Sequence, residues 1–460
     1  MSEDATLDEF VEAESESSEQ EIEDLARKTV CGIPPQDWTV ARLGELVRVV
    51  SGNSLPTEYQ NGKEGEHPVY KVSDMNATGN QKYVSDTSNR LSKEDLEEIN
   101  HTLYPDGTII LPKVGAALLT NKRRILTEPS SFDNNVMGWV PDEINPEFLY
   151  YVSCMIDMEA VAQKGAVPSI SKAIAKSLKI PSPPPSEQRK IATVLYTVDR
   201  AIEKTEEIVE QSWRVKKGLV QNLLTEGVHE HSKFETYRLG PIDLTKPADW
   251  ELKSFGEFSY KVQDGPHITP DYVDEGIPFV SSQNVRPFRE NFDYSQYEKY
   301  ISEEIYEDIN QNCRPEKGDL IISRRATIGP TQLIRHNEQF GFFVGVAIIK
   351  TNDTVHNPFL EQLMNWSVME KLWHLKSPGS TMKTLNLGTI KEQKIPLPSL
   401  QEQKAIAEIL RSQDDVITNN ERYKESLQRL KRGLQQDLLS GKVRTTNTNI
   451  EVPDEIAQHG

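Results

Sequence analysis

The stretch KIPSPPPSEQRKIATVL, from Lys179 to Leu195, recurs 215 residues later as KIPLPSLQEQKAIAEIL, from Lys394 to Leu410. The register then continues without a gap, for example at the equivalent residues Asp199 and Asp414. The repeat predicts a chain with two similar halves, and a duplicated protein commonly binds something that itself has two halves.

The repeat extends more faintly through the residues before each copy. Asp37-Trp38 corresponds to Asp249-Trp250, and Asn145-Pro146 corresponds to Asn357-Pro358, where each Asn-Pro pair suits a helix start. Short alternating apolar runs bounded by Gly and charged residues predict strands, and helical stretches lie among them. Each globular block is therefore predicted to be α+β.

Composition limits the class of protein. A chain of 460 residues exceeds a single hydrophobic core and predicts two to four structural units. The longest apolar stretch, residues 342–349, is far shorter than the ~20 residues of a membrane span. The amino terminus is acidic where a signal peptide would be basic, so we expect a cytoplasmic protein with no membrane association. The three cysteines are widely spaced, which suits neither a disulfide framework nor a zinc site.

The domain organisation follows from the repeat. The first 25 residues hold 11 Asp and Glu and no Lys or Arg, and this composition predicts a disordered tail. The predicted segments are an acidic tail (1–29), a first globular domain (30–180), a first helical spacer (181–228), a connector (229–248), a second globular domain (249–393), a second helical spacer (394–444) and a polar tail (445–460).

The two helices are predicted to pack against each other as an antiparallel coiled coil. In the first helix, apolar residues from Ile191 to Val209 step by 4, 3, 4, 3 and 4, which is the seam of a two-helix coiled coil. The second helix has apolar residues at its ends and a polar centre, so we expect packing to be firm at the ends and looser centrally. Prolines before Glu187 should prevent an earlier helix start, and Ser399 with Glu402 has the spacing of a capping box. Gly227 and Gly441 mark the helix exits. The residues predicted to form the spacer and its partner-binding surface are Glu187, Gln188, Ile191, Leu195, Ile202 and Leu219 in the first helix and Glu402, Gln403, Ile406, Leu410, Ile417 and Leu434 in the second.

Helix length suggests a measuring function. Residues 187–224 would span ~57 Å as one helix at 1.5 Å per residue. Two antiparallel copies would hold the globular domains at opposite ends, related by an approximate two-fold axis. Since DNA rises ~3.4 Å per base pair, such a spacer could hold two reading domains over two short sequences a fixed distance apart.

The second globular domain carries motifs that resemble the specificity subunits of Type I restriction-modification enzymes. It opens with Asp264-Gly265-Pro266-His267 and continues with Gly318-Asp319-Leu320-Ile321-Ile322-Ser323-Arg324. It closes with Pro378-Gly379-Ser380-Thr381-Met382 before the helix entry. The resemblance runs from about Trp38 to Arg444, in the same order in both halves, and the first half is the weaker copy.

The resemblance implies a non-catalytic subunit. In this family each recognition domain reads one half of a split DNA site, and the helices recruit two methyltransferase (M) subunits and, through them, the restriction (R) subunits. S-adenosylmethionine, ATP and Mg²⁺ would then belong to partner subunits, with no cofactor or metal in this chain. The sequence agrees, since it has no Asn-Pro-Pro-Tyr-like motif, no Gly-rich nucleotide loop and no His-Glu-x-x-His pair.

Candidate DNA contacts come from the residue types that bind phosphates and base edges. Arg and Lys contact phosphates and guanine, and Asn and Gln read adenine. The candidates are Lys113, the cluster Asn121, Lys122, Arg123 and Arg124, the loop residues Gly265, His267 and Thr269, then Gln283, Asn284 and Arg286, and finally Ser323, Arg324 and Arg325.

The acidity of the chain is unusual for a DNA-binding protein. The net charge is -19, and -8 remains without the acidic tail. Either local positive loops lie on a negative body, or the protein works in a cytoplasm salty enough to screen its charge. We hypothesise a salt-adapted prokaryote as the source.

Three other functions are compatible with parts of the sequence. A stand-alone regulator of a two-part operator would also need two reading domains, and it would bind DNA tightly without partners. A coiled-coil scaffold would not need the duplicated domains. A self-contained restriction and methylation enzyme would need catalytic motifs that the chain lacks.

Overall fold

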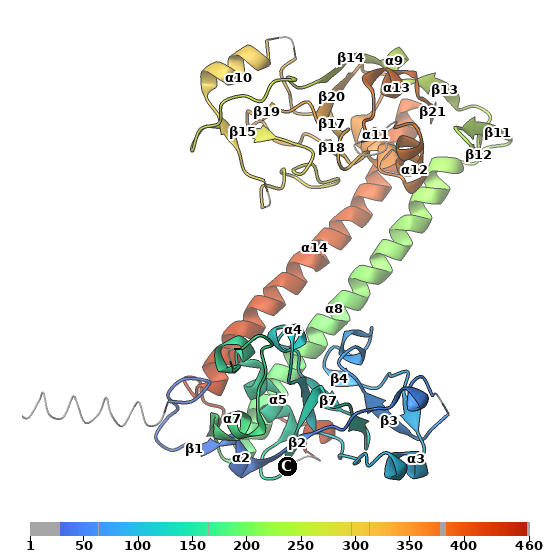
Figure 1. The fold of residues 1–460 in the computed structure, drawn as a ribbon. Helices are drawn as coiled ribbons and strands as arrows, with labels where there is room; N and C mark the ends of the chain where they lie inside the picture. The colour runs from blue at the N-terminus through green and yellow to red at the C-terminus, as the bar shows by residue number, and fades with distance from the viewer. Residues whose placement is uncertain are drawn as a thin grey trace, which may run out of the picture. The chain divides into compact units, whose positions relative to one another are not determined.

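The structure is a computed structural model that describes residues 28–457 except Lys63, Lys164, Gln296, Asn312 and residues 378–382. The chain divides into two compact units. Unit 1 comprises residues up to Lys204 together with those from Tyr423 onward, and unit 2 comprises Thr205–Arg422. Nearly all of the predicted acidic tail and the predicted motif at 378–382 lie outside the described residues. Figure 1 gives the order of the elements.

Unit 1 is built on three sheets (Figure 1). The five-stranded sheet has the order β2 (Val47–Ser51), β9 (Val136–Pro141), β6 (Ile109–Pro112), β7 (Arg124–Leu126) and β4 (Tyr83–Val84). A three-stranded sheet contains β5 (Arg90–Leu91), β3 (His67–Tyr70) and β8 (Ser131–Phe132), and a pair joins β1 (Thr39–Arg42) to β10 (Lys179–Ser182). Its short helices are α2 (Leu43–Leu46), α3 (Lys93–Glu98), α4 (Ala116–Leu119), α5 (Pro146–Cys154), α6 (Met158–Val161), α7 (Lys172–Ser177) and α15 (Asp454–Ala457).

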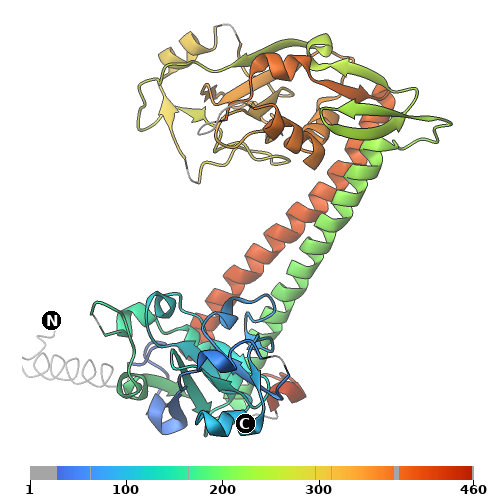
Figure 2. The ribbon, with the colours of Figure 1, turned by 45° about the vertical axis from the view of Figure 1, so that its right-hand side comes forward.

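Unit 2 repeats this plan (Figure 2). Its four-stranded sheet has the order β14 (Ser259–Asp264), β20 (Val346–Thr351), β17 (Leu320–Ser323) and β18 (Thr331–Leu333). A three-stranded sheet contains β16 (Tyr300–Ile301), β15 (Ile277–Val280) and β19 (Gly341–Phe342), and a pair joins β13 (Glu251–Ser254) to β21 (Lys394–Leu397). Its short helices are α9 (Phe255–Phe258), α10 (Glu303–Ile309), α11 (Asn357–Met364), α12 (Ser367–Leu375) and α13 (Leu387–Glu392).

The first four strands of the larger sheet in unit 1 correspond in order to the four strands of the larger sheet in unit 2, while β4 has no counterpart in that sheet. β6 and β17 are the repeated apolar runs of the sequence, and each is buried at all four of its residues. Each pairs antiparallel with the long apolar strand that follows it, β6 with β9 and β17 with β20. The predicted α+β fold of both globular domains is confirmed.

Two long helices follow the domains, α8 (Pro185–Thr225) and α14 (Leu400–Leu439). In unit 1 the first turns of α8 bury Ile191 and Leu195 in the same core as Leu438 and Leu439 from the end of α14. In unit 2 the first turns of α14 share a core with Leu223 and Leu224 of α8 in the same way. The start of one helix lies beside the end of the other in each unit, so the predicted antiparallel packing, firm at the helix ends, is confirmed.

The helix boundaries differ slightly from those predicted. α8 begins at Pro185, two residues before Glu187, because proline is well tolerated in the first helical turn, where its missing N–H has no intrahelical partner. Ser399 Oγ accepts a hydrogen bond from Glu402 N at 3.3 Å, but the Glu402 carboxylate binds Trp250 instead of completing a capping box. Gly227 and Gly441 have φ of 79° and 75°, as the predicted helix exits require.

The predicted connector and the predicted polar tail both contain packed structure. The connector 229–248 forms a hairpin of β11 (Phe234–Leu239) and β12 (Ile242–Pro247), with Tyr237 and Leu239 buried in the unit 2 core. The described part of the predicted polar tail folds onto unit 1, where Ile456 is buried and its carbonyl accepts from Asn145 Nδ2 at 3.0 Å. The overall composition of these segments does not predict this packing, because it averages a few buried apolar side chains with many polar ones.

Candidate nucleic-acid interface and helix joints

Each long helix starts at a joint with its own domain. In unit 1 the indole Nε1 of Trp38 donates to Glu187 Oε2 at 3.0 Å. In unit 2 Trp250 Nε1 donates to Glu402 Oε2 at the same distance. Both carboxylates are buried, so each needs these donors to offset its desolvation. The Trp of the repeated Asp-Trp dipeptide therefore supplies a hydrogen-bond donor to the repeated Glu in each unit.

The glutamine after each Glu has the same role in both units. Gln188 Oε1 accepts from Asn145 N at 2.9 Å, and Gln403 Oε1 accepts from His356 N at 2.8 Å. Both amide groups also donate to a proline carbonyl just before the helix, at 2.9 Å. These bonds make His356 the equivalent of Asn145, so the predicted match of Asn145-Pro146 with Asn357-Pro358 is wrong by one residue, although both segments begin a helix as expected.

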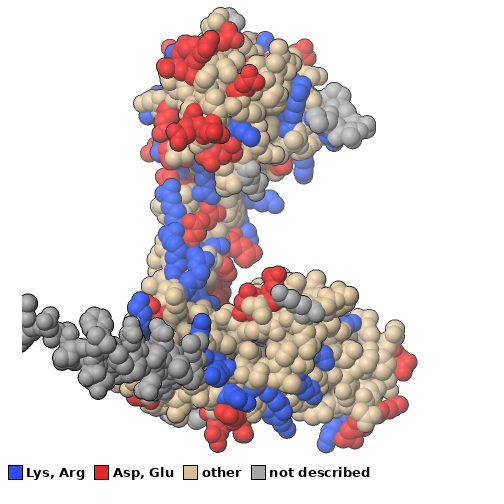
Figure 3. All heavy atoms as spheres, turned by 60° about the vertical axis from the view of Figure 1, so that its left-hand side comes forward, with Lys and Arg blue, Asp and Glu red and all other residues tan. Residues whose placement is uncertain are grey.

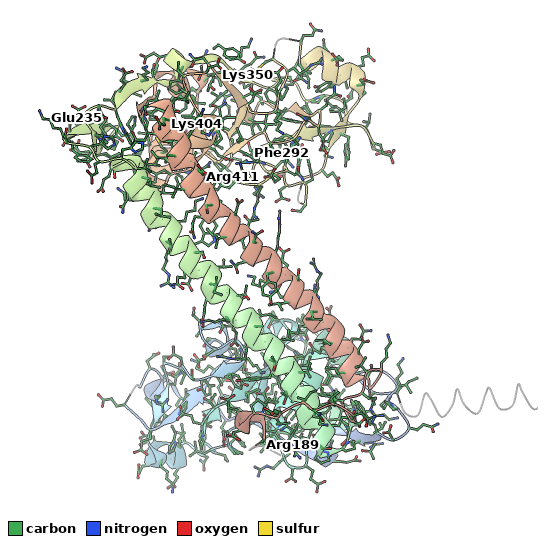
Figure 4. All side chains as sticks on the ribbon, turned by 180° about the vertical axis from the view of Figure 1, so that it is seen from behind. Arg189, Glu235, Phe292, Lys350, Lys404 and Arg411 are labelled. Carbon is green, nitrogen blue, oxygen red and sulfur yellow. The ribbon has the colours of Figure 1, made fainter. Side chains whose placement is uncertain are left out.

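The next residue in each helix is basic. Figure 4 shows Arg189 on α8 and Lys404 on α14. They extend by one residue the run of matching residue types that begins with the Glu-Gln pair.

The predicted helix residues divide into core and surface positions. Ile191, Leu195, Ile406, Leu410 and Ile417 are buried, and Ile202, Leu219 and Leu434 are half-buried. Together with the buried Glu-Gln pairs, these residues hold the helices in the cores of the units. The exposed side of each helix carries other residues, and Figure 3 shows Lys, Arg, Asp and Glu along it.

Several predicted DNA contacts have structural roles. Arg123 is 2% exposed and donates to the carbonyls of Ser153 at 3.1 Å and Ile156 at 2.6 Å. Asn284 is fully buried and donates to the carbonyls of Asp293 and Tyr297. Ser323 is also buried. These side chains are buried and bind other groups of the protein, so the structure gives them a role in holding the fold.

Arg124 and Gly265 also support the backbone. Arg124 donates to the carbonyls of Arg123 at 2.7 Å and Met75 at 2.6 Å. Gly265 is required by close approach, because a Cβ there would lie 2.0 Å from the carbonyl oxygen of Phe342. The glycine therefore allows β14 to pass over the end of β19.

The loop after β14 contains a buried arginine in an ion pair and an exposed histidine. Arg324 is 5% exposed, forms an ion pair with Asp264, and donates to Leu385 O at 2.9 Å. Burial lowers the pKa of Arg324, and Asp264 acts against this shift. Asp264 also lies 3.2 Å from Nε2 of the exposed His267. Arg324 thus positions the loop, and of the predicted loop residues His267 and Thr269 are exposed.

The remaining candidates are accessible in part. Asn121, at φ 54°, and Gln283 are exposed, and Lys122 is half-buried and contacts Asn76. Arg286 is half-buried with Asp293 at 3.1 Å, and Arg325 is half-buried. The structure does not bring the candidates of unit 1 into one cluster. Lys113 lies in a separate pocket with Lys172, a residue that the sequence did not single out.

The comparisons with known proteins agree with this duplicated architecture. The family described as "Type I restriction modification DNA specificity domain" matches residues 35–211 and again residues 247–429. The chain belongs to this family. It is a DNA specificity subunit with two specificity domains, as the sequence motifs predict.

Archaeal relatives match nearly the whole chain. The putative Type I restriction enzyme MjaX specificity subunit of Methanocaldococcus jannaschii is 28% identical over 448 residues, covering 92% of this chain and 97% of the relative. The MjaVIII specificity subunit of the same organism is 26% identical over 431 residues, covering 90% and 95%.

Among solved structures, the S subunit from M. genitalium has the same fold, with a TM-score of 0.55 at 16% identity, covering 87% of this chain and 96% of that chain. Among the described residues of the present chain, no helix is long and apolar enough to cross a membrane.

Proposed function

We propose that this specificity subunit reads a bipartite DNA site, with one domain for each half-site, and that α8 and α14 recruit two M subunits and, through them, R subunits. The observation that carries this proposal is the contrast between the halves. The helix starts agree in residue identity and in hydrogen-bond distance, as at Glu187 and Glu402. The domains differ at equivalent positions, as at Ser51 and Asp264, so they would serve different sequences, while the helices would serve identical partners.

An outward apolar stripe on α14 supports partner docking. Ile409, Val416, Tyr423 and Leu430 are spaced by seven residues and are 40%, 42%, 56% and 50% exposed. A seven-residue apolar repeat is the pattern of a helix that packs against another helix. The equivalent positions of α8 include Ile208 and Val215, which are also exposed. Each long helix would therefore offer a partner a second apolar face in addition to its buried one.

The subunit would have no catalytic activity of its own. S-adenosylmethionine, ATP and Mg²⁺ would bind the M and R subunits, and the complex would work in the cytoplasm. Photocrosslinking with labelled S-adenosylmethionine tests the first point: label is expected on M subunits, and label on this chain would contradict it. The hypothesis of a salt-adapted source stays a prediction, and assembly that is best in dilute buffer would contradict it.

The decisive experiment maps methylated adenines in a genome whose cells express this chain with its M subunit. The expected result is a motif of two short blocks separated by a fixed spacer. A continuous motif, or no methylation, would overturn the proposal. A gel shift separates it from a stand-alone regulator, since tight specific binding by this chain without M subunits would favour a regulator.

A further inference from the structure

Unit 1 contains a small pocket into which two lysines converge. The pocket has a volume of about 290 Å³, and its lining includes Ser51, Lys113, Met137, Ser169, Ser171 and Lys172. It lies where the end of β2, the residue after β6 and the start of α7 meet. Three separate segments of chain therefore contribute polar side chains to one small space.

Backbone hydrogen bonds fix the position of each segment. Lys113 N donates to Asn135 O at 2.9 Å, and Lys113 O accepts from Ile170 N at 3.0 Å. Ser51 is the last residue of β2 and is paired with Met137 of β9. Lys172 is the first residue of α7, whose cap is Ser171. The backbone that carries both lysines is therefore held in place, with the Lys113 side chain half-buried and the Lys172 side chain exposed.

The two cations form no ion pair in the part of the chain that the structure describes. Neither Lys113 nor Lys172 forms an ion pair there, at a limit of 4.0 Å. Burial lowers the pKa of Lys113, and the charge of Lys172 lowers it further, with only Asp133 opposing. Asp133 itself is held by Asn135 N, which donates to its Oδ1 at 2.9 Å. An anion in the pocket would relieve this repulsion.

At the equivalent position in unit 2, a carboxylate forms an ion pair with the basic residue. The strand registers pair Ser51 with Met137 and Asp264 with Ala347, which makes Asp264 the counterpart of Ser51. Arg324 follows β17 as Lys113 follows β6, and it forms an ion pair with Asp264. α13 begins with Leu387 where α7 begins with Lys172. Unit 2 therefore has one cation in an ion pair where unit 1 has two cations, neither of which forms an ion pair among the described residues.

We propose that the Lys113–Lys172 pocket binds a phosphate group of the DNA backbone, and that unit 1 alone has this contact. Two ammonium groups and the neighbouring serine hydroxyls are the donors that phosphate oxygens accept from. The proposal rests on the proposed function, because it needs DNA to lie on unit 1. It deepens that function, since unit 1 would contact a backbone phosphate of its half-site through this pocket and unit 2 would not.

The experiment is a methylphosphonate scan, in which single backbone phosphates of the bipartite site are made neutral one at a time. The wild-type subunit, bound to M subunits, is expected to lose affinity at a phosphate of the half-site read by unit 1. The variant K113Q/K172Q is expected to bind unmodified DNA about 10-fold more weakly and to be insensitive at that same phosphate. An unchanged scan profile in the variant would overturn the proposal. The salt dependence gives a second readout, because the slope of log affinity against log salt should fall by about 0.9 for one lost phosphate.

A second variant keeps the test independent of folding defects. S51D places in unit 1 the carboxylate that unit 2 already has, so it should pair with Lys113 and leave the melting temperature unchanged or higher. It is expected to reproduce the weaker binding and the insensitive phosphate of K113Q/K172Q. Wild-type affinity in S51D would overturn the proposal. K93Q, at an exposed lysine on α3, is the matched control and should leave the scan unchanged.

Titration of inorganic phosphate separates the two sources of this anion. Chemical-shift changes confined to Lys113 and Lys172 together with the altered DNA scan support the DNA assignment. Phosphate binding without any change in the DNA scan would show a small-anion site and overturn the DNA assignment. If the wild-type complex binds no split site, the proposed function is wrong. Whether the pocket binds an anion is then decided separately by the phosphate titration, and no phosphate binding would show that the pocket is not an anion site.

Discussion

Lys216 Nζ lies 2.5 Å from Asp414 Oδ1, and this ion pair joins α8 to α14 within unit 2. Both side chains are at most 10% exposed. Gln362 Nε2 donates to Asp414 at 2.6 Å, and the ammonium of Lys216 lies 3.4 Å from the ring centroid of Phe288. The pair therefore has the further partners that a buried charge requires.

The repeat forms the same ion pair in unit 1 with the helices exchanged. There Lys431 of α14 lies 2.5 Å from Asp199 of α8, and Tyr151 OH donates to Asp199 at 2.6 Å. Because each pair joins one helix to the other, a slip of either helix by one turn would separate the charges. We infer that these pairs set the register of the two helices.

The first prediction concerns the energy of this pair. Asp414→Ala should lower the free energy of unfolding by about 3 kcal/mol, because it leaves the buried Lys216 without a counterion. The charge swap Lys216→Asp with Asp414→Lys should recover part of the loss. Chemical denaturation of the single and double variants gives the coupling energy. Glu210→Ala is the control, since its ion pair with Arg214 is more than 70% exposed and should contribute less than about 0.5 kcal/mol. A similar loss in both variants would contradict the prediction.

The second prediction concerns pH, because the two helix joints use different cations. Arg444 joins Glu187 to Asp37 in unit 1, and His231 joins Glu402 to Asp249 in unit 2, at 3.0 Å from each carboxylate. Burial lowers the pKa of His231, but hydrogen bonds and charge from Glu402 and Asp249 outweigh it, so the pKa is raised overall. Trp250 and Phe234 contact the same imidazole edge to face and bring no charge.

A raised pKa in the folded state sets the sign of the pH effect. The stabilising charge of His231 is fully present below the unfolded pKa of ~6.5 and is lost as pH rises through the higher folded value. The wild-type chain should therefore lose stability relative to His231→Arg as pH rises above ~6.5. Thermal unfolding of both proteins from pH 6 to 9 measures this difference. His231→Gln should remove this pH dependence too, but from a lower starting stability, and parallel curves for wild type and His231→Arg would rule out the effect.

The third prediction separates a structural arginine from a DNA contact. Arg123→Ala should lower the free energy of unfolding by about 3 kcal/mol, because the carbonyls of Ser153 and Ile156 lose a charged donor. The DNA affinity of the folded fraction should stay at the wild-type value. Lys122→Ala, at the neighbouring and more accessible position, is the comparison and should leave stability within about 0.5 kcal/mol. If Arg123→Ala loses DNA affinity while its stability is unchanged, Arg123 is a DNA contact and the prediction is wrong.

Local signals account for what the sequence predicts well. The repeat and the 4-3 spacing are properties of neighbouring residues, and they correctly place Ile191 and Ile406 in the cores. The role of Arg123 is different, because it depends on carbonyls near the end of α5 that only the fold brings to it. Lys113 and Lys172 are 59 residues apart in the sequence, and only the fold brings them to one pocket. Residue type alone cannot distinguish an arginine that satisfies backbone carbonyls from one that faces a ligand.

The last prediction tests the outward stripe on α14 as a docking surface for M subunits. Tyr423→Asp combined with Leu430→Asp places two carboxylates on the apolar stripe without touching the buried seam, because both side chains are at least half exposed. The variant should fold with a melting temperature near the wild-type value but fail to form the complex with M subunits, since a buried unpaired charge costs several kcal/mol per group. Analytical ultracentrifugation of mixtures with the M subunit measures assembly directly.

Gln436→Asp is the matched control for this experiment. Gln436 is exposed on the same helix but lies on a different face from Leu430, because successive residues turn by about 100°. It should assemble like wild type. Complete assembly of Tyr423→Asp/Leu430→Asp would show that M subunits dock elsewhere. Equal loss in the variant and in Gln436→Asp would mean that added charge alone, and not the apolar stripe, controls assembly.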